Sequence, residues 1–167
     1  SARPDYVFGL VAGLSWKGLS VSMQWTGALH ASRVLSGEYR TPFGTQNSRS
    51  LLTYLADGRW TEENMDNARF PRLTFVNKTQ YTRDSDLWLM DGSYLRLKTA
   101  EVAYTFKDKA LMKAGISSFK VFLSGYNLLT LFSELEQYDI DPEGSTGDGT
   151  YTYPNNRIFN FGINITF

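Results

Sequence analysis

The sequence predicts an all-β fold of antiparallel up-and-down strands. Stretches of the chain alternate apolar with small or polar side chains at the period of two that a half-buried β-strand requires. They cover residues 5–16, 19–30, 93–106, 118–128 and 157–167. Short and long connections alternate between them, and the long ones are residues 31–92 and 129–156. With 167 residues, the chain can form one domain with a sizeable core.

The first two stretches predict a long hairpin. Apolar side chains occupy every second position from Tyr6 to Trp16, and residues 19–30 alternate in the same way. Lys17 and Gly18 lie between the two stretches and have the composition of a tight turn. Two strands joined by so short a link run antiparallel.

The third stretch changes phase along its length. Its even positions are polar at Arg96 and Lys98 and become apolar from Ala100 onward. Glu101 is therefore expected on the opposite, polar face of the strand, together with Thr99. The link to the fourth stretch has room for one helical turn, and the fourth and fifth stretches alternate regularly.

The composition excludes several kinds of site. Seventeen Lys and Arg balance seventeen Asp and Glu, so the net charge does not indicate a nucleic-acid partner. There is no cysteine and His30 is the only histidine, which excludes thiolate and multi-histidine metal sites. No catalytic triad or Gly-rich phosphate loop is recognisable, so an enzyme is the class with least support. We expect no cofactor.

The alternation of short and long connections is typical of an outer-membrane β-barrel, with short periplasmic turns and long extracellular loops. In that arrangement Trp16, Phe106, Phe119 and Phe167 lie near one boundary of the lipid-facing surface, as an aromatic girdle requires. No apolar run approaches the roughly 18 residues of a membrane helix, and no signal-peptide pattern opens the sequence. The alternative is a soluble β-sandwich that binds carbohydrate through exposed aromatic side chains.

The last eight residues, NFGINITF, fit the assembly signal of bacterial outer-membrane barrels: a polar residue, a glycine, alternating apolar positions and a final aromatic. These positions are Asn160, Gly162, Ile163, Ile165 and Phe167. In this interpretation the apolar residues face lipid, Gly162 permits close approach of a neighbour, and Phe167 lies at the periplasmic interface.

Longer motifs resemble one family. SDLWLMDGSYLRLKTAEVAYTF, then SFKVFLSGYNLLTL and YDIDPE, resemble the last part of SusC-like (SusC/RagA) TonB-dependent outer-membrane transporters. FGLVAGLSWKGLSVSMQWTGALH and RWTEENMDNARFPRL are also similar to the family. The resemblance implies the C-terminal segment of a large, 22-stranded transmembrane β-barrel. The signal sequence and the plug domain of such a transporter would lie upstream.

The family resemblance also implies a function and partners. The function is TonB-dependent import of glycan fragments or peptides across the bacterial outer membrane, without covalent chemistry. The expected partners are a SusD-like surface lipoprotein, the TonB complex through upstream regions, the barrel-assembly machinery and the lipid membrane.

Aromatic residues of the first long loop are candidates for substrate contact, because an aromatic ring packs well against the apolar face of a sugar. The first choice is Trp60 beside Arg59, followed by Tyr54 and Trp88. Tyr81 belongs to the same set. The alternative is that these rings pack beneath the loop or against the lipoprotein.

Residues 139–150 resemble a calcium loop in their spacing. Asp139, Asp141 and Glu143 occupy the first, third and fifth positions, and Gly144 the sixth. Thr150 stands where a bidentate glutamate is required, so a solvated loop is the alternative to a weak calcium site.

Overall fold

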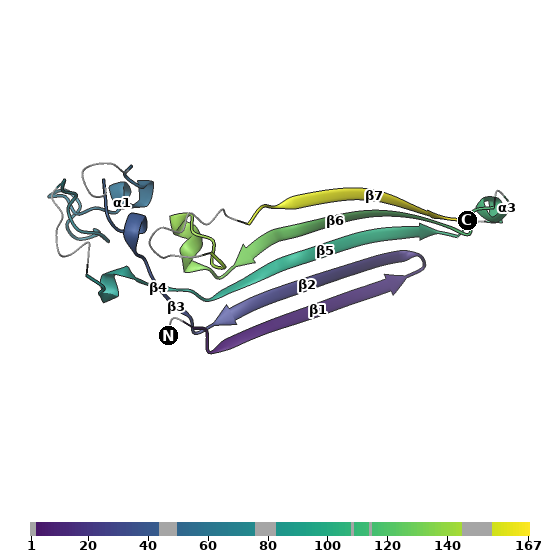
Figure 1. Cartoon of the computed structure of the whole chain (residues 1–167), viewed down its shortest axis with the longest axis horizontal. Helices are drawn as coiled ribbons and strands as arrows, with labels where there is room; N and C mark the ends of the chain where they lie inside the picture. Colours follow the sequence, from purple (N-terminus) through teal and green to yellow (C-terminus); the bar gives the residue numbers. More distant parts are fainter. Residues whose placement is uncertain (1–2, 44–49, 76–82, 108, 114, 145–154) are drawn as a thin grey trace. The chain divides into compact units, whose positions relative to one another are not determined.

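The computed structural model describes residues 3–43, 50–75, 83–107, 109–113, 115–144 and 155–167. The chain forms two compact units (Figure 1). We call Tyr6–Leu29, Tyr94–Ser133 and Asn155–Phe167 the sheet unit. The loop unit consists of Ser1–Asp5, His30–Ser93 and Glu134–Pro154. Among the described residues, no helix has the length and apolar character needed to cross a membrane.

The sheet unit is a single five-stranded antiparallel sheet, which confirms the predicted fold class. Its strands are β1 (Tyr6–Trp16), β2 (Leu19–Leu29), β5 (Tyr94–Phe106), β6 (Ser118–Leu131) and β7 (Ile158–Thr166). Figure 1 shows them side by side in this order, with the short helix α3 (Lys109–Lys113) in the link between β5 and β6. The short links within the pairs β1–β2 and β5–β6 make the members of each pair neighbours, while β2–β5 and β6–β7 pair across the two long loops.

A β-bulge explains the change of phase in the third predicted strand. Gln24 pairs with Thr99, but the next residue, Trp25, pairs with Leu97, so Lys98 is an extra residue on β5. One inserted residue moves every later side chain to the other face. The even positions of β5 are therefore polar before the bulge and apolar after it.

Strand β6 has an irregularity at the same level of the sheet. Between its pairings with β5, Asn127 adopts a left-handed backbone with φ 52°. The amine of Lys98 donates a hydrogen bond of 3.4 Å to the Asn127 side-chain oxygen, which links the two irregularities. Pairing then resumes, so β6 extends to Leu131, three residues beyond the predicted end of the strand at 128.

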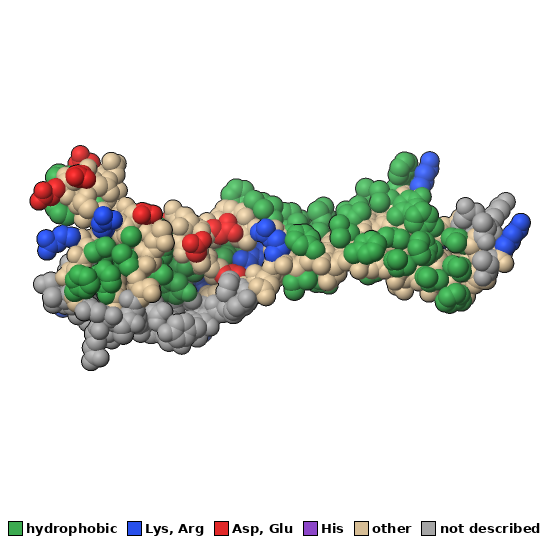
Figure 2. All heavy atoms as spheres, turned by 90° about the horizontal axis from the view of Figure 1, so that it is seen from above, with side chains coloured by type: hydrophobic (Ala, Val, Ile, Leu, Met, Phe, Trp, Pro, Cys, Tyr) green, Lys and Arg blue, Asp and Glu red, His purple; other side chains and the backbone are tan. Residues whose placement is uncertain are grey.

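The register places apolar side chains in rows across the sheet. One row crosses all five strands through Leu14, Val21, Val102, Leu123 and Phe161. Most of these side chains are exposed, and Figure 2 shows hydrophobic side chains gathered over the strands. We call this surface the apolar face. A β-sandwich would bury such a face against a partner sheet of similar size.

The opposite surface, the polar face, carries hydroxyl, amide and charged groups. Thr99 and Glu101 lie on it as predicted, and Glu101 forms a 2.8 Å ion pair with Lys120 of the neighbouring strand. The Thr99 hydroxyl lies 3.5 Å from the side-chain oxygen of Gln24. Alternation of an apolar face with a polar one suits strands between lipid and a wet lumen.

The elements described in the loop unit are all short. These are β3 (Ser32–Val34), η1 (Gly37–Tyr39), α1 (Thr53–Asp57), η3 (Asp86–Trp88), β4 (Leu89–Asp91) and η4 (Glu134–Tyr138). Strands β3 and β4 pair antiparallel, and the Gly92 N–H donates to the Ala31 carbonyl at 2.8 Å. The two ends of the first long loop are thus held together by backbone hydrogen bonds.

Candidate functional site

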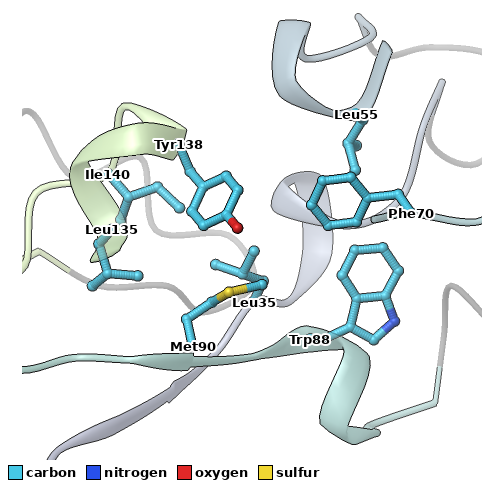
Figure 3. Packing of buried hydrophobic residues seen from close by; sticks show 8 residues of the cluster. All are labelled: Leu35, Leu55, Phe70, Trp88, Met90, Leu135, Tyr138 and Ile140. Atoms are coloured by element: carbon cyan, nitrogen blue, oxygen red, sulfur yellow. The ribbon is translucent and has the colours of Figure 1, made fainter. Parts of the chain in front are cut away.

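The two long loops fold around one hydrophobic core. Its buried members are Leu35, Leu55, Phe70, Trp88, Met90, Leu135, Tyr138 and Ile140 (Figure 3). The last three come from the second long loop, and the others from the first. Burial of apolar area stabilises the folded loops by about 25 cal/mol per Å². Such a core gives the described parts of these loops a defined conformation, which long polar loops usually lack.

Aromatic stacking organises this core. The rings of Phe70 and Trp88 stack with centroids 5.5 Å apart and planes at 15° (Figure 3). Tyr138 meets Phe70 edge-on at 6.2 Å and Tyr54 at 5.0 Å. Each such pair contributes about 0.5–1.5 kcal/mol beyond its buried area. Residues from both loops therefore fix one another's positions.

Polar contacts join distant parts of the first long loop to one another. The guanidinium of Arg40, nine-tenths buried, forms a 2.6 Å ion pair with the exposed carboxylate of Asp84. The Tyr54 hydroxyl donates a hydrogen bond to the backbone carbonyl of Tyr39. Burial raises the pKa of Tyr54 well above its ordinary value, so the phenol stays protonated and remains a donor.

Glu134 connects the second loop to the first. Its Oε2 accepts a 2.7 Å hydrogen bond from the backbone N–H of Asp91, and its Oε1 lies 3.9 Å from the guanidinium of Arg69. Arg69 also lies 3.6 Å from the Met90 sulfur. The Glu134 carboxylate thus adds one directional hydrogen bond from a backbone amide and one ion pair with a guanidinium to the apolar core.

Arg59 and Trp60 lie on a compact loop, which we call the 59–70 loop. At its base, the backbone N–H of Phe70 donates to the Gly58 carbonyl and that of Trp60 to the Phe70 carbonyl, both at 2.8 Å. Phe70 is buried in the core, while Met65 at the far part of the loop is exposed. The loop is therefore anchored at one end and presents the rest of its residues to solvent.

The structure separates the four sequence-predicted contact residues into two pairs. Trp60 is 38% exposed and Arg59 is exposed, with its guanidinium bonded to the Ala56 carbonyl. Trp88 has no exposed surface and Tyr54 is largely covered, so both have the packing role that the sequence left open as the alternative. Tyr81 lies outside the described residues.

The weak calcium prediction stays a prediction, because residues 145–150 of the proposed loop lie outside the described residues. Among the described residues, no group of three Asp, Glu or His side chains could hold a metal ion. The Asp141 carboxylate instead accepts a 2.9 Å hydrogen bond from the backbone N–H of Glu143, and the Gly144 N–H donates to the Asp141 carbonyl. Asp139 is exposed, and Thr150 lies outside the described residues. Within the described part, Asp141 and Glu143 thus form a turn in which the Asp141 side chain accepts from the nearby backbone.

The predicted assembly-signal residues occupy both faces of β7. Ile163 and Ile165 pair with Val121 and Phe119 on the apolar face, and Asn160 and Gly162 lie on the polar face. Phe167, directly after the strand, is 85% exposed. A Cβ on Gly162 would lie 2.3 Å from the ring of Phe122. The neighbour for which Gly162 leaves room is therefore an aromatic ring of β6.

The expected aromatic residues gather at one end of the sheet. Trp16 ends β1, and Phe106 of β5 lies 5.6 Å from Phe119 of β6 between ring centroids. Tyr104, which the sequence analysis did not include, packs edge-on against Phe106 at 4.6 Å. We call this end, where the β1–β2 turn and α3 lie, the turn end of the sheet unit.

The sequence is similar to two proteins of Formosa agariphila. It is 32% identical to TonB-dependent receptor P26 over 178 aligned positions, which include 100% of this chain and 17% of the receptor. It is 25% identical to TonB-dependent receptor P3, over 98% of this chain and 16% of that receptor. No protein-family model matches the sequence.

Solved structures of the RagAB peptide transporter resemble the chain over its whole length. One matches with a TM-score of 0.74 and 27% identity, over 100% of this chain and 18% of the transporter chain. The peptide importer in its closed-closed state gives a TM-score of 0.73 and in its open-open state 0.71, each at 27% identity. The chain thus spans less than a fifth of the length of each relative.

Proposed function

Because this chain has the sequence and fold of a barrel segment of the SusC-like TonB-dependent outer-membrane receptors, we propose that it serves nutrient import across that membrane. Its strands would form part of the barrel wall and its long loops part of the extracellular surface. The cargo would be peptides or glycan fragments, moved with energy from the TonB complex. The description of RagAB as a peptide transporter supports peptides as the first class to test.

The observation that carries this proposal is the two-faced sheet joined to folded long loops. An exposed apolar face opposite a polar one suits a strand between lipid and a water-filled lumen. The β-sandwich alternative lacks support, since the other sheet among the described residues has only two strands of three residues each. The names of the relatives describe receptors and transporters, which agrees with a function without catalysis.

The 59–70 loop is our candidate for contact with cargo or with a SusD-like lipoprotein. It holds an exposed indole and an exposed guanidinium next to each other, and these are the groups enriched at interface hot spots. Its base is fixed by hydrogen bonds to Gly58 and by the burial of Phe70. A surface held in this way loses little conformational entropy on binding.

Replacing Trp60 with alanine is expected to raise the apparent KM for uptake about tenfold, because truncation of an interface aromatic costs about 1–2 kcal/mol. Uptake of labelled peptides and oligosaccharides by cells with matched surface levels of transporter measures the effect. Phe75→Ala removes another exposed aromatic of the loop unit and is the control. Equal uptake constants in the two variants would remove the 59–70 loop from the proposal. Pull-down of the lipoprotein by each variant separates cargo contact from partner contact.

Replacing Phe167 with serine is expected to lower the amount of inserted transporter several-fold and to leave the affinity of the inserted protein unchanged. The basis is the proposed role of NFGINITF in recognition by the barrel-assembly machinery. Phe159→Ser makes the same chemical change at the other end of β7, on the apolar face, and is the control. Quantitative immunoblots of outer membranes measure insertion. If Phe167→Ser inserts as well as wild type, the residue belongs to an ordinary strand end.

A further inference from the structure

The polar face contains a hollow of about 340 Å³ at the turn end of the sheet unit. Ser15 and Ser20 line this hollow and pair with each other. Ser20 also pairs with Ala103, and Thr105, two residues further along β5, lines the hollow from the same face. The N–H of Thr105 donates to the Gly18 carbonyl at 2.8 Å, and Gly18 has φ 92°, a conformation that favours glycine. The β1–β2 turn is thus fixed against β5, and the hollow is a built feature of this face.

The sheet unit is basic although the whole chain has no net charge. It contains eight Lys and Arg against two Asp and Glu, whereas the loop unit contains nine against fifteen. Four of the eight are lysines in the β1–β2 turn and in residues 107–113. Of the two acidic residues, Glu101 is paired with Lys120, and Asp108 lies outside the described residues. The turn end therefore carries an excess of positive charge, which attracts anionic groups.

Two of these lysines line the hollow. Neither Lys17 nor Lys107 forms an ion pair within the described ranges. Lys107 continues the alternation of the polar face directly beyond the end of β5 at Phe106. The Lys17 amine lies 4.9 Å from the centroid of the Trp16 ring, a contact that holds the amine at the turn without neutralising it. Ammonium and hydroxyl groups both donate hydrogen bonds to carboxylate oxygens, so this set of donors suits a carboxylate.

The position of the hollow determines which molecules reach it. The polar face points away from lipid when the apolar face contacts lipid. Short turns lie on the periplasmic side of outer-membrane barrels, and the hollow lies beside the β1–β2 turn. In the proposed transporter the hollow therefore faces the periplasmic end of the lumen, where imported cargo would leave. Both proposed classes of cargo supply carboxylates, because every linear peptide ends in one and acidic sugars carry one.

We propose that the turn end of the polar face is a carboxylate-binding subsite at the exit of the lumen, an inference that rests on the function proposed above. Lys107 pairs with the carboxylate, the hydroxyls of Ser15 and Thr105 donate hydrogen bonds to it, and Lys17 adds positive charge from the turn. Two sources supply such a group: the cargo, or a segment of the transporter outside this chain that reaches the lumen. One exposed ion pair changes affinity by about fivefold, so the subsite holds a carboxylate and still releases it.

Carbodiimide cross-linking of the full-length transporter in neutral detergent tests the subsite, because this reagent joins an amine to a carboxylate that contacts it. Mass spectrometry measures the amide formed at each lysine with and without added trialanine. We expect Lys107 to give about fivefold more amide than Lys113, an exposed lysine of α3 at the same end of the sheet. A product with trialanine identifies the cargo as the source. A product formed without peptide, with a residue outside these 167 positions, identifies the transporter's own segment.

The C-terminal amide of trialanine is the matched ligand, because it lacks the carboxylate and keeps the rest of the peptide. Where the cargo is the source, Lys107→Gln is expected to lower the affinity for trialanine about fivefold and to leave that for trialanine amide unchanged. Lys113→Gln should change neither affinity, and an equal loss in this control would reduce the effect to net charge and overturn the proposal.

Equal amide yields at Lys107 and Lys113, both with and without peptide, would also overturn the subsite. Neither measurement depends on uptake. A transporter that imports peptides but shows no preferred amide at Lys107 would therefore contradict the subsite and leave the proposed import in place, whereas failure of import would not remove a measured amide.

Discussion

Replacing Trp88 with alanine is expected to unfold both long loops while the strands stay assembled. The indole has no exposed surface, stacks on Phe70 and lies in the core to which both loops contribute. Truncating a buried tryptophan costs about 3–5 kcal/mol through lost burial and the cavity left behind. Short loop elements have little stability of their own to offset such a loss. The Trp60→Ala variant changes the same residue type at an exposed position and is the control.

Hydrogen exchange on the transporter in detergent measures this effect. In Trp88→Ala, peptides that cover residues 50–75 and 134–144 should exchange faster together, because Phe70 and Tyr138 belong to one core. Peptides from β5 and β6 should keep their protection. Faster exchange in the first loop alone would show that the second loop folds independently, contrary to the shared core.

The strands could be predicted because apolar and polar residues alternate with a period of two along a strand that has one buried face. The bulge in β5 was also visible in the sequence. The even positions of this strand are polar at Arg96 and Lys98 and apolar from Ala100 onward, which is a change of phase. The sequence pattern does not show which residue is the extra one, because a bulge is defined by the pairing with a neighbouring strand. Only the register against β2 and β6 identifies Lys98.

The shared core of the loops could not be predicted in the same way. Leu35, Phe70 and Tyr138 are far apart in sequence and follow no common period, and their contacts form only in three dimensions. The sequence therefore presented Trp88 as a candidate for ligand contact, although the fold uses it for packing. The acidic spacing that begins at Asp139 is ambiguous for a related reason. A spacing gives the order of oxygen atoms but not their direction, and Asp141 turns toward its own backbone.

The assignment of the apolar face to lipid and the polar face to water predicts which of two substitutions destabilises the barrel more. Val102 lies on the apolar face between Val21 and Leu123, and its side chain is about half exposed. If this face contacts lipid, Val102→Arg should destabilise the barrel by about 2–4 kcal/mol, the cost of a charge near the middle of the bilayer. Thr99→Arg introduces the same group on the polar face of the same strand, where water can solvate it.

Equilibrium unfolding in urea with lipid vesicles, together with the amount of folded transporter in outer membranes, would measure the difference. We expect Val102→Arg to lower both quantities, and Thr99→Arg to stay within about 1 kcal/mol of wild type. Val102→Leu keeps an apolar side chain and should behave as wild type, which separates charge from size. A larger loss in Thr99→Arg than in Val102→Arg would mean that the faces are assigned the wrong way round.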